Sequence, residues 1–141
     1  MSEFNQAPTK PHMHPRPLIL VADDDELLQA VVEHKLVAAG YDVVTVGDGG
    51  AVLEHIERLS PQALVLDAMM PIMDGFEVLR RLKSDPKLEH IPVMMLTALR
   101  RDSDIVTALN LGAADYVSKP FNPEELIARL GRLAPLQRKI A

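Results

Sequence analysis

The sequence of 141 residues contains no cysteine, which excludes disulfide bonds and thiolate-bound metals. It has no apolar run close to the roughly 20 residues that a membrane-spanning helix requires. Its N-terminus also lacks the apolar core of a secretory signal peptide. Positive charge is not in excess either, and the net charge of −5 argues against binding to a nucleic-acid backbone. We therefore expect a cytoplasmic domain that binds neither membranes nor nucleic acid.

The composition suits one folded domain. Of all residues, 48% are hydrophobic and 25% are charged, so a chain of this length can bury one core. Near the N-terminus prolines are frequent and no periodic apolar pattern is present. We predict a flexible tail over residues 1–16, a folded domain over 17–134 and a second tail over 135–141. His12 and His14 lie in the first tail, and we interpret them as solvated residues rather than metal ligands.

Within the predicted domain, short apolar runs alternate with segments that have helical apolar spacing. Strands are predicted at 18–22, 41–46, 63–66, 91–96 and 114–118. Helices are predicted at 26–39, 50–59, 74–83, 102–111 and from 123 to about 135. Such alternation indicates an α/β fold with a parallel sheet. Because the strands are almost continuously apolar, we expect helices to cover both faces of the sheet.

At the ends of four predicted strands, the sequence changes from apolar residues to residues with reactive groups. Three aspartates follow the first strand, Asp67 follows the third, Thr97 follows the fourth and Lys119 follows the fifth. Ligands of open parallel sheets bind at this carboxyl edge. Clustered carboxylates repel one another unless a cation joins them, and oxygen-only ligands suit Mg²⁺. Acids, a lysine and a hydroxyl together fit phosphoryl transfer to a carboxylate.

Four segments in succession resemble the signatures of response-regulator receiver domains from two-component signalling: ILVADDD, LVLDAMMPIMDG, MMLTA and GAADYVSKPFNPEEL. The resemblance covers about residues 16–133. It implies a flavodoxin-like (βα)5 fold, a doubly wound five-stranded parallel sheet with strand order 2-1-3-4-5. It also implies a signalling domain that catalyses only its own phosphorylation and dephosphorylation, and is otherwise not an enzyme.

The resemblance also assigns roles around a Mg²⁺ ion. Asp67 matches the aspartate that accepts the phosphoryl group. Asp24 matches a direct metal ligand, and Asp23 matches an acid that acts mainly through water. The backbone carbonyl of Met69 matches the remaining protein ligand. On the residues alone, Asp24 or Asp25 could instead cap the following helix, and we expect Asp25 to be that cap.

A second group of residues matches positions that respond to the phosphoryl group. The Thr97 hydroxyl and the Lys119 amine match the groups that bond it, and Tyr116 matches an aromatic whose rotamer follows the threonine. For Tyr116, ordinary packing against the sheet is the alternative. Pro120 matches a proline preceded by a cis peptide bond. Met69 and Leu99 match positions that flank the path of the attacking water in this family, and we predict that they lengthen the lifetime of the phosphorylated state.

The same resemblance implies partners. The phosphoryl donor would be a phosphohistidine of a histidine kinase or of a histidine phosphotransfer protein. The downstream protein partner would bind the face formed by the fourth helix, fifth strand and fifth helix. We expect a single-domain regulator, either a monomer or a phosphorylation-dependent dimer, and the alternative is a receiver fragment of a larger regulator. Winged-helix transcription regulators dimerise through charged residues on this face. At two of these positions the chain has the uncharged residues Ile105 and Ala114, and at two others it keeps charged residues, Glu125 and Arg129.

Two other classes of protein are disfavoured. An aspartate-nucleophile phosphatase also uses carboxylates and Mg²⁺, but it requires a second acid two residues after its nucleophile, where this chain has Met69. A flavodoxin-like electron carrier requires a phosphate-binding loop after the first strand, where this chain has three aspartates that would repel a phosphate.

Overall fold

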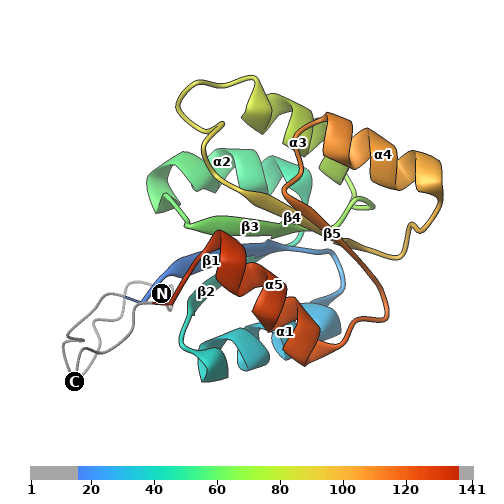
Figure 1. Ribbon diagram of the computed structural model, residues 1–141. Coiled ribbons are helices and arrows are strands. Elements are labelled where there is room, and N and C mark those ends of the chain that lie inside the picture. The colour runs from blue at the N-terminus through green and yellow to red at the C-terminus, as the bar shows by residue number, and fades with distance from the viewer. Residues whose placement is uncertain (1–15, 137–141) are drawn as a thin grey trace.

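The computed structural model describes residues 16–136, so nearly all of the first predicted tail, with His12 and His14, and residues 137–141 lie outside the described part. Five strands alternate with five helices in these residues (Figure 1). Their bounds are β1 Leu18–Ala22, α1 Glu26–Ala39, β2 Asp42–Val46, α2 Gly49–Leu59, β3 Ala63–Leu66, α3 Gly75–Lys83, β4 Val93–Thr97, α4 Asp102–Asn110, β5 Asp115–Ser118 and α5 Pro123–Leu133. Among the described helices, none is long and apolar enough to cross a membrane.

The five strands form one parallel sheet in the order β2-β1-β3-β4-β5. Helices α2, α3 and α4 cover one face, and α1 and α5 cover the other (Figure 1). This arrangement confirms the predicted fold class and strand order. It places the ends of β1 and β3 next to each other, because these strands pair from Ile19 with Ala63 to Ala22 with Leu66.

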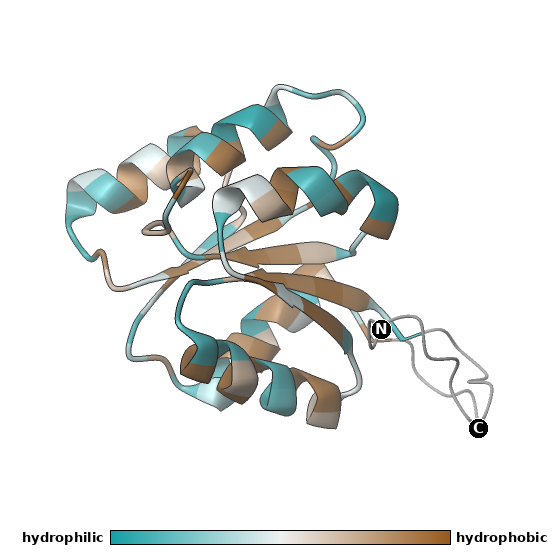
Figure 2. Cartoon of the chain, turned by 180° about the vertical axis from the view of Figure 1, so that it is seen from behind, coloured by the Kyte–Doolittle hydropathy of each residue, from teal (hydrophilic) through white to brown (hydrophobic). Residues whose placement is uncertain are grey.

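Each face of the sheet has its own hydrophobic core. Along β1, Leu20 and Ala22 pack with α2, α3 and α4, while Ile19 and Val21 pack with α1 and α5. The strands appear as apolar bands between the two helical layers (Figure 2). Because both faces of β1, β3 and β4 are buried, these three strands need apolar residues at nearly every position, which explains their almost continuously apolar sequence.

Most helices begin at a side-chain cap. Asp25, Asp48, Asp74 and Asn122 accept hydrogen bonds from backbone N–H groups in the first turns of α1, α2, α3 and α5. Helix α4 follows Arg101, which makes no side-chain cap hydrogen bond. The structure thus confirms Asp25 as the cap of α1, which leaves the carboxylates of Asp23 and Asp24 available for other contacts.

Several boundaries differ from the predicted ones by one or two residues, and two of the differences have a clear physical reason. Strand β4 begins at Val93 rather than at residue 91. Pro92 accepts a hydrogen bond from Leu64 N, but it has no N–H to donate to the sheet. Arg16, the last residue of the predicted tail, is attached to the domain, since its Nη2 donates to the carbonyls of Val37 at 2.7 Å and Tyr41 at 2.9 Å.

Two described residues other than glycine have left-handed backbone conformations, namely Ser60 at the end of α2, with φ 45°, and Ile72. Ile72, in the loop between β3 and α3, has φ 71°, in the left-handed region. An L-residue pays roughly 1–2 kcal/mol there relative to the right-handed region, and a β-branched side chain is especially rare in it. Glycine or asparagine would adopt this conformation at lower cost.

We expect the Tyr41→Phe substitution to destabilise the fold by about 1–3 kcal/mol. The Tyr41 side chain is fully buried, and its hydroxyl donates to the Ala134 carbonyl at the end of α5 over 2.8 Å. Phenylalanine would keep the ring but leave that buried carbonyl without its donor. Urea denaturation should show a lower midpoint at an unchanged slope. An unchanged midpoint would show that water replaces the hydroxyl at no cost.

Candidate functional site

Three carboxylates converge at the carboxyl edge of the sheet. Asp23 and Asp24 follow β1, and Asp67 follows β3. One oxygen from each lies within 4.8 Å of the others. Asp23 and Asp67 are 3% and 5% exposed, whereas Asp24 is exposed to solvent. The cluster therefore has two buried acids and one at its mouth.

Lys119 joins this cluster from the end of β5. Its Nζ lies 2.7 Å from Asp23 Oδ2 and 3.1 Å from Asp67 Oδ2. Burial alone would lower the pKa of Lys119, but the hydrogen bonds to both acids outweigh burial and raise it. The lysine is therefore charged at neutral pH. The peptide bond between Lys119 and Pro120 is cis.

The charge of the cluster is not balanced within the described residues. Lys119 is the one cation there that pairs with members of this cluster, and it contacts Asp23 and Asp67. Burial raises the pKa of Asp23 above its ordinary value, and the hydrogen bond from Lys119 offsets this only in part. A divalent cation would neutralise the remaining charge, and its oxygen-only donor set is the one that Mg²⁺ prefers.

The buried acids are held in fixed orientations by backbone N–H groups. Asp67 Oδ1 accepts from Met69 N at 3.1 Å, while its Oδ2 faces Lys119. Asp23 Oδ1 accepts from Asp25 N at 2.9 Å. In each carboxylate, one oxygen accepts a hydrogen bond from a backbone N–H of the loop that follows, and the other oxygen faces Lys119.

Thr97 and Tyr116 are linked through a single residue of the loop after β4. Thr97 is fully buried, and its Oγ1 accepts from Leu99 N at 3.3 Å. The Tyr116 hydroxyl donates to the Leu99 carbonyl at 2.6 Å. Burial raises the pKa of Tyr116, and the negative charges of Asp104 and Asp67 raise it further. A movement of Leu99 would therefore alter the surroundings of both side chains.

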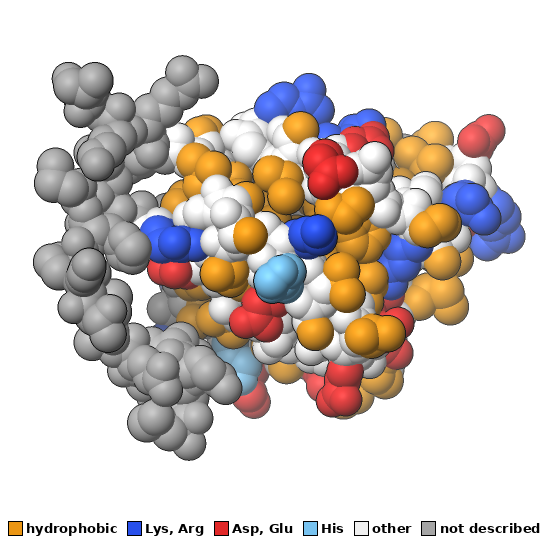
Figure 3. Space-filling view, turned by 90° about the horizontal axis from the view of Figure 1, so that it is seen from below, with side chains coloured by type: hydrophobic (Ala, Val, Ile, Leu, Met, Phe, Trp, Pro, Cys, Tyr) orange, Lys and Arg blue, Asp and Glu red, His pale blue; other side chains and the backbone are white. Residues whose placement is uncertain are grey.

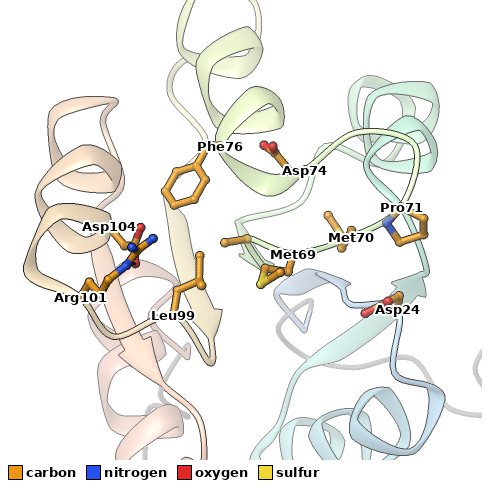
Figure 4. A pocket seen from close by; sticks show the side chains of 10 residues that line it. Asp24, Met69, Met70, Pro71, Asp74, Phe76, Leu99, Arg101 and Asp104 are labelled. Carbon is orange, nitrogen blue, oxygen red and sulfur yellow. Dashed lines mark hydrogen bonds and ion pairs between the residues drawn. The ribbon is translucent and has the colours of Figure 1, made fainter.

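A cavity of about 680 Å³ opens beside the acids. Both Met69 and Leu99 line it, one from the loop after β3 and the other from the loop after β4 (Figure 4). Met69 is 59% exposed. The remaining lining residues are Asp24, Ala68, Met70, Pro71, Asp74, Phe76, Arg101 and Asp104.

Gln29, for which no role is predicted from the sequence, lies against the acidic loop after β1. Gln29 Nε2 donates to the Asp23 carbonyl and, at 2.9 Å, to the Val46 carbonyl. It thereby ties the loop after β1 to the end of β2. The one sequence signal was its position in α1, one turn after the cap Asp25.

Comparisons with known proteins agree with this geometry. Residues 19–131 match the family described as response regulator receiver domain. The chain is 44% identical over 112 residues to a probable transcriptional regulator ycf27 of Porphyridium aerugineum, covering 79% of this chain and 45% of that protein. A putative response regulator from Chloroflexus aurantiacus superposes with a TM-score of 0.81 at 33% identity, covering 84% of this chain and 98% of that one.

A third neighbour bears on the metal. The receiver domain of the sensor histidine kinase PA1611 from Pseudomonas aeruginosa has a magnesium ion coordinated in its active-site cleft. It is 31% identical, with a TM-score of 0.78 and coverage of 84% of this chain and 98% of that chain. The fold, the acidic cluster and these matches together show that the chain belongs to the response regulator receiver domain family. It spans about half the length, or less, of the curated relatives that it matches first.

Proposed function

We propose that Asp67 accepts a phosphoryl group from a phosphohistidine of a histidine kinase or a histidine phosphotransfer protein. The observation that carries this proposal is the position of Asp67, which lies between two further carboxylates and the Lys119 amine. In the transfer, the bond from phosphorus to the histidine nitrogen breaks as a bond to an Asp67 oxygen forms. Positioning and charge neutralisation are the main contributions a protein makes to such a reaction.

Asp23, Asp24, Asp67 and the Met69 carbonyl would hold Mg²⁺, which supplies positive charge where the phosphoryl oxygens gather. The three carboxylates fit this ion because their oxygens already lie close together. Asp67 contributes one oxygen to the phosphoryl bond and keeps the other oriented by its neighbours. Lys119, already 3.1 Å from Asp67 Oδ2, is placed to pair with the incoming group.

The proposed switch begins at Thr97. Its hydroxyl would move to donate a hydrogen bond to the phosphoryl group, and this movement would disturb the separate hydrogen bond that Thr97 Oγ1 accepts from Leu99 N. Because Tyr116 bonds the carbonyl of the same residue, its rotamer would respond to that change. Phosphorylation would thus shift the balance between two existing conformations of Thr97 and Tyr116 rather than create a new conformation.

The output surface that we propose consists of α4, β5 and α5. Val106 and Leu109 on α4 are 53% and 49% exposed and provide apolar contact area. Arg129 on α5 bonds Asp115 Oδ1 at 2.9 Å and also pairs with Glu125. Since these charges are already paired within the chain, a protein partner or a second copy would have to rearrange them.

The domain acts either as a single-domain regulator or as the receiver of a longer regulator, as in the transcriptional relatives.

We expect phosphorylation by phosphoramidate to require Mg²⁺ and to fall sharply in Asp24→Ala. Mg²⁺ should also raise the melting temperature of the parent protein by mass action, because it binds the folded state alone. The experiment measures labelling by mass spectrometry and melting temperature, each with Mg²⁺ and with a chelator.

Glu26→Ala is the matched control, because Glu26 is an acid in the first turn of α1 that is absent from the cluster. It should keep both Mg²⁺ effects. A parent protein that is labelled equally well with the chelator, or an Asp24→Ala variant that keeps the full melting shift, would refute the metal assignment.

A further inference from the structure

One polar side chain of α1 is turned away from solvent. On the face of the molecule that α1 and α5 cover, charged side chains are scattered among apolar ones (Figure 3). The exposed polar residues of α1 are Glu26, Glu33, His34 and Lys35. Gln29 is the remaining polar residue of this helix, and it is partly buried. Because burial of an amide is unfavourable unless the amide is hydrogen-bonded, the contacts of Gln29 have to account for its position.

The Gln29 amide joins the ends of two neighbouring strands. Its Nε2 donates to the carbonyls of Asp23, directly after β1, and Val46, the last residue of β2. Asp23 N also donates to the Val46 carbonyl, at 3.1 Å. A side-chain amide has two N–H groups, so both are used here. The reversed amide would point its oxygen at two carbonyl oxygens, so these surroundings fix its orientation.

Through these bonds, Gln29 acts on the most buried acid of the cluster. Asp23 is 3% exposed, and its carboxylate is held by Asp25 N at 2.9 Å and by Lys119 Nζ at 2.7 Å. The backbone of Asp23 is held on one side by Val46 and on the other by Gln29. The oxygens of the three acids lie within 4.8 Å of one another only while this backbone keeps its place.

We propose that Gln29 is a positioning residue that sets the affinity of the acidic cluster for Mg²⁺ by fixing the backbone of Asp23. This inference rests on the metal site proposed above. Gln29 is uncharged and would act through Asp23, not on the ion or on the phosphoryl group. Groups that orient metal ligands from outside the coordination sphere typically change metal affinity by about 10–100-fold when they are replaced.

Gln29→Met tests this role, because methionine has a similar length but donates no hydrogen bond. Isothermal titration calorimetry should give a Kd for Mg²⁺ that is about tenfold higher than in the parent. In labelling by phosphoramidate, the Mg²⁺ concentration for half-maximal rate should rise by the same factor. The rate at saturating Mg²⁺ should stay at the parental value, whereas general damage to the fold would lower it.

Two charged replacements separate positioning from electrostatics. Gln29→Glu keeps the shape of the side chain but cannot donate, and it adds negative charge near the ion. Gln29→Arg adds positive charge but can bond two carbonyls, as Arg16 does with those of Val37 and Tyr41. Charge alone would strengthen Mg²⁺ binding in Gln29→Glu and weaken it in Gln29→Arg. Positioning predicts the reverse order, with the lower Kd in Gln29→Arg.

Gln62→Met is the matched control. Gln62 Oε1 accepts from Leu18 N at 3.1 Å, so this glutamine also bonds the backbone, but at the opposite end of β1. The control should keep the parental Kd. If Gln29→Met binds Mg²⁺ as tightly as Gln62→Met, or if Gln29→Glu binds it more tightly than Gln29→Arg, the positioning role is overturned. A parent protein that does not bind Mg²⁺ would overturn the proposed metal site, and the role of Gln29 with it.

Discussion

Asp67→Asn is expected to abolish phosphorylation by phosphoramidate and by every histidine kinase that phosphorylates the parent protein. An amide oxygen is a far weaker nucleophile than a carboxylate oxygen, so the phosphoryl group has no acceptor. Asparagine has nearly the same shape and can still accept the hydrogen bond from Met69 N. The fold should survive, because Lys119 keeps Asp23 as its partner at 2.7 Å. Intact-protein mass spectrometry after incubation with each donor measures the effect.

Asp25→Asn provides a matched control for this substitution. It makes the same chemical change at an acid of the same sheet edge, where the side chain caps α1 by accepting from Leu27 N and Leu28 N. Asparagine caps helices as well as aspartate does, so stability should be retained. This variant should be labelled like the parent. Labelling of Asp67→Asn at the parental level would contradict the assignment of the phosphoacceptor.

The convergence of the acids and the lysine could be predicted because it depends only on strand order and direction. Once the apolar runs define parallel strands, the residues that follow them must share one edge. Asp23, Asp67 and Lys119 meet there although Lys119 is 96 residues from Asp23 along the chain. The contact distances and the partial burial of the centre depend on side-chain packing, which the sequence pattern does not specify.

Two other features could not be predicted, for different reasons. Gln29 acts through side-chain hydrogen bonds to two backbone carbonyls, and such bonds leave no periodic trace in the sequence. Ile72 is in the left-handed region, although isoleucine has a strong preference against it. Local preference alone would place glycine or asparagine there, so the geometry of the loop between β3 and α3 overrides it. Such disagreements between local preference and structure are expected at functional sites.

Phosphorylated Asp67 should be long-lived, and Met69→Asn combined with Leu99→Glu should shorten its lifetime about tenfold or more. Water must reach the phosphorus atom through the cavity that Met69 and Leu99 line (Figure 4). Leu99 cannot hydrogen-bond a water molecule, and the Met69 sulfur is only a weak acceptor. Polar replacements would admit a water molecule and orient it toward the phosphorus atom. Lowering the barrier by about 1.4 kcal/mol suffices for a tenfold faster reaction.

The geometry makes this double variant a clean test. Leu99 bonds Thr97 and Tyr116 only through its backbone, so the side-chain change leaves both hydrogen bonds available. The protein is loaded with phosphoramidate, freed of donor and followed in Mg²⁺, so that docking of a kinase does not enter the measurement. Val106→Asn with Leu109→Glu places similar polar groups on the outer face of α4 and should decay like the parent. If the Met69 and Leu99 double variant decays no faster than this control, water reaches the acyl phosphate by another path, and these residues do not set its lifetime.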